Sequence, residues 1–167
     1  MPSTLTLDVE RGLDADRFLL QPAANFFVKL NAGNFFGVPN LVWVGPDRFL
    51  YDPIPGKEFG FQRANGDKVI PQKMYTNGGS IPKLVQPLPD LSPWTYGAAF
   101  LIHDWEFEAH HLGKSDKSFE EVNKTLAEGI KTLMDAKICR NNPFALYTIW
   151  AGVSSGVAKA IWDGQMA

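Results

Sequence analysis

The sequence has one cysteine, little net charge and no long uninterrupted hydrophobic run. Because Cys139 stands alone, an internal disulfide and a multi-cysteine zinc site are excluded, and a reducing compartment is compatible with the composition. The chain has 16 basic and 18 acidic side chains and a net charge of -2. This balance gives no overall electrostatic attraction to nucleic acid, so we do not expect a nucleic-acid partner.

Two kinds of targeting or membrane segment are also missing from the pattern. Residues 1–10 lack a basic stretch followed by an apolar block, so we expect no signal peptide. The most apolar segment, residues 143–162, contains Ser154, Ser155 and Lys159. We therefore expect a buried helix there rather than a transmembrane segment.

What is present fits one domain with a hydrophobic core, since 45% of the 167 residues are hydrophobic. The part from residue 1 to 75 is predicted to be β-rich. Asn65-Gly66 lies between two β-prone runs and predicts a hairpin. The short runs that we interpret as strands are residues 26–30, 41–44, 48–51, 59–63 and 68–70.

A Gly/Pro-containing loop, residues 76–92, separates this part from a helical part, residues 93–167. We expect helices over 93–111, from Ser115 as N-cap to about residue 136, and from Asn142-Pro143 onward. Gly152 and Gly156 should leave one face of the last helix nearly bare for close packing. The fold class is therefore α+β: antiparallel β-hairpins or a small sheet, then three helices that include an antiparallel helix hairpin.

The candidate site combines a glycine loop with a polar pair in an apolar helix. The loop is Thr76-Asn77-Gly78-Gly79-Ser80-Ile81-Pro82, and the pair is His103-Asp104 within residues 98–107. If the chain reverses near Gly113, two antiparallel helices result, and His103 and Asn123 each lie roughly ten residues from the turn. Because a helix rises about 1.5 Å per residue, the two side chains would then lie at similar heights. Asn123 could then accept a proton from one ring nitrogen of His103, and Asp104 could bind a cation or the Gly78-Gly79 loop.

Simpler interpretations remain open for each feature. His103 could be a buried histidine satisfied by a neighbour, and the Asn77 to Ser80 loop could be a tight turn with positive φ. His110 and His111 are typical of a helix C-terminus, although a metal role is the alternative. Glu120 and Glu121 suit the first turn of a helix that begins after Ser115 or Ser118.

These motifs resemble an uncharacterised phage and prophage family, catalogued as domain of unknown function 1353. The similarity extends from Val69 to Trp162 and is carried by the segments 69–71, 76–82, 98–107, 122–130 and 145–162. The resemblance implies a protein of the bacterial host cytoplasm or of the virion. It also implies a partner that is another phage or host protein.

The chain departs from this family at two positions. Asn77 and Asn123 stand where relatives more often have aspartate. An asparagine keeps the acceptor oxygen but loses the negative charge, so a divalent cation should bind more weakly here. Asp104 would then be the main carboxylate ligand.

A more distant similarity in layout is to phospholipases of the A2 class. It implies that His103 activates water, oriented by Asn123 as the other catalytic residue. Asp104, together with Asn77 and the Gly78 and Gly79 loop, would hold a calcium ion; Phe107 replaces a tyrosine of that pattern.

Two functions therefore compete. The first is a non-enzymatic virion, assembly or host-interaction factor, in which the His-Asp-Asn cluster is structural. The second is a metal-assisted hydrolase of an ester or phospholipid. The asparagines at 77 and 123 favour the first, and the adjacency of His103 and Asp104 favours the second.

Overall fold

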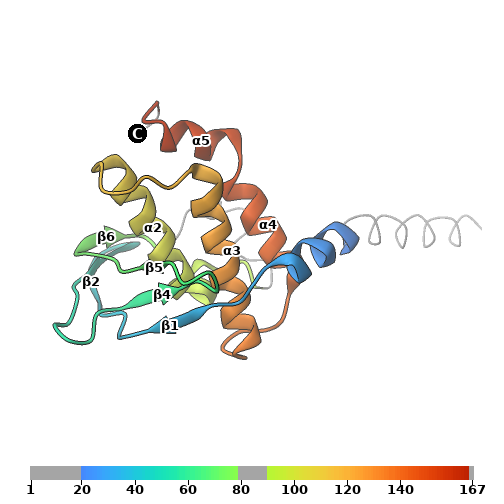
Figure 1. Ribbon diagram of the computed structural model, residues 1–167. Helices are drawn as coiled ribbons and strands as arrows, with labels where there is room; N and C mark the ends of the chain where they lie inside the picture. The colour runs from blue at the N-terminus through green and yellow to red at the C-terminus, as the bar shows by residue number, and fades with distance from the viewer. Residues whose placement is uncertain (1–19, 79–89, 166–167) are drawn as a thin grey trace, which may run out of the picture.

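The computed structural model describes residues 20–78 and 90–165 and has the α+β organisation that the sequence predicts (Figure 1). The strands are β1 (Asn34–Phe36), β2 (Leu41–Gly45), β3 (Arg48–Tyr51), β4 (Gly60–Gln62), β5 (Lys68–Val69) and β6 (Met74–Thr76). The helices that follow are η1 (Pro93–Tyr96), α2 (Gly97–His111), α3 (Phe119–Asp135), α4 (Pro143–Val153) and α5 (Gly156–Trp162).

The strands form two antiparallel three-stranded sheets, ordered β1-β4-β5 and β2-β3-β6. The predicted hairpin joins β4 to β5, with Phe61 opposite Val69 and Gly66 at φ +91° in the turn. The other predicted pair is β2 with β3, where Leu41 lies opposite Tyr51. Strand β6 then pairs with β3, which places Thr76 beside Phe49.

The expected strand at residues 26–30 is wrong, because residues 20–29 are helical. Ala23, Phe26, Phe27 and Leu30 follow the spacing of one helix face, a pattern that is hidden when only five residues are considered. The helix brings the Phe26 ring to 4.4 Å from the Trp150 ring of α4. Packing against the helical part therefore decides this segment.

Helices α2 and α3 form the predicted hairpin around Gly113. Gly113 has φ +68°, and the Lys114 N–H donates to Ala109 O at 2.7 Å, which closes the end of α2. The N-cap of α3 is Ser118, whose hydroxyl accepts from Glu121 N at 3.1 Å, rather than Ser115. Ser115 instead accepts from Lys117 N within the connecting turn.

Helix α2 lies between the two halves of the core. Ala99 and Phe100 belong to a cluster with Leu126 and Leu146 from α3 and α4. Four other α2 residues pack against side chains of the two sheets: Leu101, Ile102, Trp105 and Ala109. Because α2 packs against other elements on both of these sides, a polar side chain on either side is removed from water. Such a side chain therefore needs a hydrogen-bond or ion-pair partner.

The last apolar segment is two helices rather than one buried helix. Asn142 caps α4 by accepting from Ala145 N, and Pro143 occupies the first turn, as the sequence predicts. The chain bends by 53° between α4 and α5. Within the described ranges, no single helix is long and apolar enough to span a membrane, although this bent pair meets the criteria of length and composition jointly.

The glycines of this segment do not support close helix packing. A Cβ built on Gly152 or on Gly156 meets no atom within 4 Å. Gly156 begins α5, and Gly152 faces open space. The close approach of helices occurs instead at Gly129 of α3, where an added Cβ would lie 3.2 Å from Ala99 Cβ of α2.

Candidate functional site

His103 of α2 and Asn123 of α3 face each other across the helix hairpin, as the sequence predicts. His103 Nε2 lies 2.9 Å from Asn123 Oδ1, and their exposed fractions are 7% and 1%. Burial lowers the pKa of His103 to about 4, although the hydrogen bond that it donates to Asn123 acts in the opposite direction and raises the pKa. The imidazole is therefore neutral near pH 7. Because the amide oxygen can only accept, Nε2 carries the hydrogen and the lone pair is on Nδ1.

Asp104 is linked to the glycine loop through Thr76. The Thr76 hydroxyl donates to Asp104 Oδ2 at 2.5 Å and accepts from Gly78 N at 3.0 Å. Burial raises the pKa of Asp104 to about 6, while the bond from Thr76 lowers it. These bonds connect α2 to the end of β6, so Asp104 contacts the loop through its first residue, Thr76, which was not among the predicted site residues.

Gly78 occupies a backbone conformation that suits glycine. Its φ is +83°, as expected for the loop, and an added Cβ would lie 2.9 Å from the Trp94 ring. The Trp94 ring in turn packs against Phe49 of β3, with 4.7 Å between centroids. Gly78 therefore lies close to Trp94, which itself packs on the β2-β3-β6 sheet. Gly79 and Ser80, the remaining loop residues of the predicted site, lie outside the described residues.

The described part of the predicted cation site does not make up a metal centre. No group of three His, Cys, Asp or Glu side chains that could hold a metal ion occurs within residues 20–78 and 90–165. Asp104 is the single carboxylate of the predicted set, and Thr76 already occupies one of its oxygens. His110 stacks on Trp162 at 3.7 Å, and His111 Nε2 donates to the carbonyls of Ile161 and Trp162.

A large cavity of about 1030 Å³ adjoins His103 and Asp104. It lies between α2, the α4–α5 pair, the turn between β2 and β3, and β6 with Asn77. The sequence motif therefore does lead to a concave site, which is the usual form of a ligand-binding site. The bend between α4 and α5 has a local signal that our sequence interpretation did not use, because Ser155 caps α5 by accepting from Ala158 N and lies between Ser154 and Gly156. The sequence does not show, however, that the two helices form walls of a cavity with α2.

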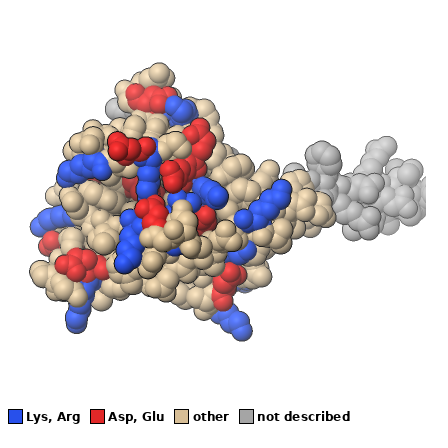
Figure 2. Space-filling view, viewed as in Figure 1, with Lys and Arg blue, Asp and Glu red and all other residues tan. Residues whose placement is uncertain are grey.

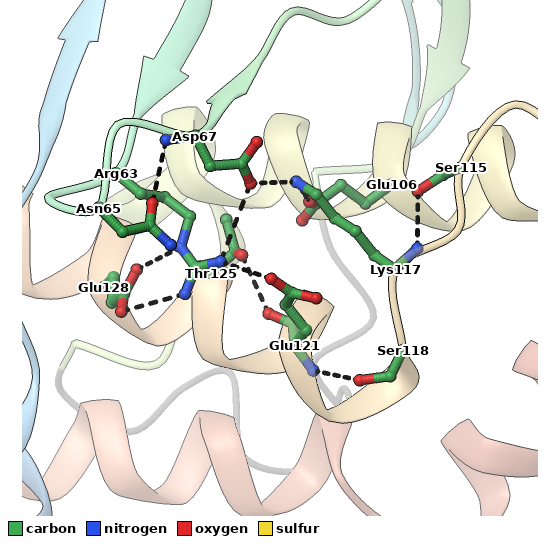
Figure 3. Close-up of polar contacts among 10 residues, drawn as sticks. All are labelled: Arg63, Asn65, Asp67, Glu106, Ser115, Lys117, Ser118, Glu121, Thr125 and Glu128. Atoms are coloured by element: carbon green, nitrogen blue, oxygen red, sulfur yellow. Dashed lines mark hydrogen bonds and ion pairs between the residues drawn. The ribbon is translucent and has the colours of Figure 1, made fainter.

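A second polar cluster lies on another face of the helix hairpin and was not predicted (Figure 3). Arg63, which follows β4, bonds Glu128 of α3 through Nε at 2.7 Å, and both side chains are 5% exposed. Its Nη1 reaches Glu121 at 3.1 Å. Lys117 joins Glu106 of α2 at 2.8 Å to Asp67 of the β4–β5 turn at 2.7 Å.

This charge network joins the β4–β5 hairpin to α2 and α3. Burial raises the pKa of Glu106 to about 7 in spite of the Lys117 ammonium, which lowers it. The sequence carries little signal for this network, because the helix neighbours of Glu128 include other polar residues, Thr125 and Thr132. Arg63, the partner of Glu128, is far away along the chain, so the pairing depends on the tertiary fold.

Acidic and basic side chains alternate on the face of the molecule drawn in Figure 2, where neither sign forms a separate patch. This distribution agrees with the small net charge of -2. In comparisons with known proteins, no family model, curated protein or solved structure matches this chain. The resemblance to the phage family therefore stays a prediction.

Proposed function

We propose that this chain is a phage- or prophage-type protein that acts by binding another protein. Its role would be that of a virion component, an assembly factor or a factor that acts on a host protein, in the bacterial cytoplasm or in the virion. The resemblance of residues 69–162 to the phage family supports the origin. The exposed edge strand β2 supports binding to another protein, and it is the observation that carries the proposal.

Strand β2 presents apolar side chains to solvent at the edge of its sheet. Val42, Trp43 and Val44 are 47%, 69% and 47% exposed. Within the described residues β2 pairs with β3 only, so its other edge has unpaired backbone groups. Exposed apolar edge strands favour pairing with an extended segment of another chain. We therefore expect the partner to add a strand to β2.

The His-Asp-Asn cluster has a structural role in this proposal. The bond between His103 and Asn123 holds α2 to α3, and the bonds from Thr76 hold α2 to β6. These polar groups thus join α2 both to the next helix and to a strand of the β2-β3-β6 sheet.

Photo-crosslinking in phage-producing bacterial cells tests the proposal. A photoreactive amino acid at position 42 should form a discrete cross-link to one phage or host protein. The same amino acid at position 138 is the matched control, because Ile138 is 71% exposed and lies far from β2 in the sequence. Adding Trp43→Lys should abolish the cross-link, since a charge on an edge strand opposes pairing. Equal yields at both positions, or no cross-link, would contradict the proposal.

One observation favours the alternative, a small ester or phospholipid hydrolase. His103 lines the cavity and has its lone pair on Nδ1, so it could accept a proton from an attacking water. Its lowered pKa makes it a weak base, and the described residues hold no cation centre. We expect no turnover of esters or phospholipid micelles, with or without calcium. Calcium-dependent turnover that is abolished by His103→Ala would establish the hydrolase instead.

A further inference from the structure

The cavity has an apolar body formed by α4 and α5. Ile149 and Val153 of α4 and Val157 and Ile161 of α5 line one side, and Phe107 of α2 lines the other. Val157 is 62% exposed, so its side chain is not used to fill the core. Such walls bind aliphatic groups by removing apolar surface from water.

The polar end of the cavity offers hydrogen-bond acceptors. His103 Nδ1 has no hydrogen bond within residues 20–78 and 90–165, and neither has Asp104 Oδ1 in those ranges. Both residues line the cavity. The nearby Gly78 N–H, which could have bound an anion, already donates to Thr76 Oγ1. A ligand head that donates hydrogen bonds therefore fits this end better than one that accepts them.

The acidic side chains that line the cavity also favour a ligand head with hydrogen-bond donors, in particular one with a positive charge. Two acidic residues of α2 line the cavity, Asp104 and Glu108, which lie four residues apart on one face of the helix. Among the described lining residues, Arg48 is the only lysine or arginine. Its guanidinium lies over the Tyr75 ring, 4.1 Å from the centroid. Among the described lining residues, the two carboxylates of α2 thus favour a cation at the polar end.

We propose that this cavity binds a small aliphatic amine, with its ammonium group against Asp104 and His103 and its hydrocarbon chain between α2 and the α4–α5 pair. The ammonium supplies N–H donors for His103 Nδ1 and Asp104 Oδ1, and a positive charge for the Asp104 carboxylate. This binding site goes beyond the proposed role of β2 and does not depend on it.

Isothermal titration calorimetry on the full chain tests the ligand class with four probes of equal chain length. The probes are octylammonium, octyltrimethylammonium, 1-octanol and octanoate. Octylammonium should bind most tightly, at least tenfold better than octanoate, which has the opposite charge. Octyltrimethylammonium keeps the charge but has no N–H donor, so it should bind more weakly than octylammonium.

Two variants with one matched control test the location. Gly152 lines the cavity and an added Cβ meets nothing within 4 Å, so Gly152→Leu should fill the cavity without a clash and abolish binding. Ala151→Leu adds bulk to the same helix at an exposed residue that does not line the cavity, and should leave binding unchanged. Asp104→Asn retains the acceptor for Thr76 but removes the charge. It should weaken octylammonium binding at least tenfold and leave octanol binding unchanged.

Circular dichroism and thermal melting establish that each variant is folded before titration. The proposal is overturned if octylammonium binds no better than octanoate. It is also overturned if folded Gly152→Leu binds octylammonium like the wild type, or if Asp104→Asn does. A loss of binding in Ala151→Leu equal to that in Gly152→Leu would likewise remove the cavity as the site.

Discussion

The two acidic residues Asp104 and Glu106 lie on opposite faces of α2, because two residues correspond to about 200° around a helix. Glu106 contacts Lys117 in a network that includes Arg63 and Glu128. Asp104 accepts one hydrogen bond within the described part of the chain, from Thr76, and lines a cavity. Both carboxyls have raised pKa values, since burial penalises their charged forms. The difference shows that two carboxyls of one helix can be buried in different surroundings, one within an ion-pair network and the other at the wall of a cavity.

The largest effect should come from breaking the network at Arg63. Arg63→Ala leaves Glu128 buried without its partner, which should lower the free energy of unfolding by about 3–5 kcal/mol. Urea denaturation measures the change. The double variant Arg63→Met with Glu128→Leu is the control, because removing both charges should recover much of the loss. A loss below about 1 kcal/mol in Arg63→Ala would show that the network holds nothing together.

A smaller effect is expected on the cavity side. His103→Ala removes the partner of Asn123 Oδ1, and the buried amide Nδ2 has no partner among the described residues either. The free energy of unfolding should fall by about 1–3 kcal/mol. Thermal or urea denaturation measures it, with His103→Gln as the control that retains a side-chain donor. An unchanged melting temperature in His103→Ala would mean that this contact is only weakly coupled to the fold.

The buried Glu106 carboxyl makes stability depend on pH. Burial raises its pKa from the ordinary value of 4.5 to about 7 in the folded protein, so its contribution to stability is complete below about pH 4.5 and is lost as pH rises through 7. Glu106→Gln lacks this loss. Its stability relative to the wild type should therefore rise between these values with a slope of up to about 1.4 kcal/mol per pH unit.

Urea denaturation at several pH values measures that slope. Taking the difference between variant and wild type cancels the contributions of His103 and Asp104, whose pKa values are shifted in opposite directions. A difference that does not vary with pH would show that Glu106 is ionised throughout, with Lys117 outweighing burial.

The smallest effect should come from an ion pair outside both clusters. Lys159 and Asp163 of the α5 region lie 2.6 Å apart, but their side chains are 43% and 36% exposed. Lys159→Ala should change the free energy of unfolding by about 0.5 kcal/mol or less. A change as large as that of Arg63→Ala would mean that burial does not explain the difference between the clusters.

Much of the fold follows from local patterns. The Asn65-Gly66 hairpin, the end of α2 at Gly113, and the start of α4 at Asn142-Pro143 each depend on a few neighbouring residues, and each prediction is confirmed. The contact between His103 and Asn123 was also predictable, because a helix hairpin with a short turn fixes which residues lie opposite each other. The helix at residues 20–29 was missed because its apolar face extends beyond the short segment that resembled a strand.

The sequence by itself determined the α+β class, the positions of α2 and α3, and the meeting of His103 with Asn123, since these depend on turns, caps and periodicity within short stretches. Only the tertiary structure decided the pairing of Arg63 with Glu128, the hydrogen bond between Thr76 and Asp104, and the cavity beneath the bent α4–α5 pair. These features join residues that are distant along the chain. No local pattern encodes such partners, because their contact depends on how sheets and helices pack around the common core.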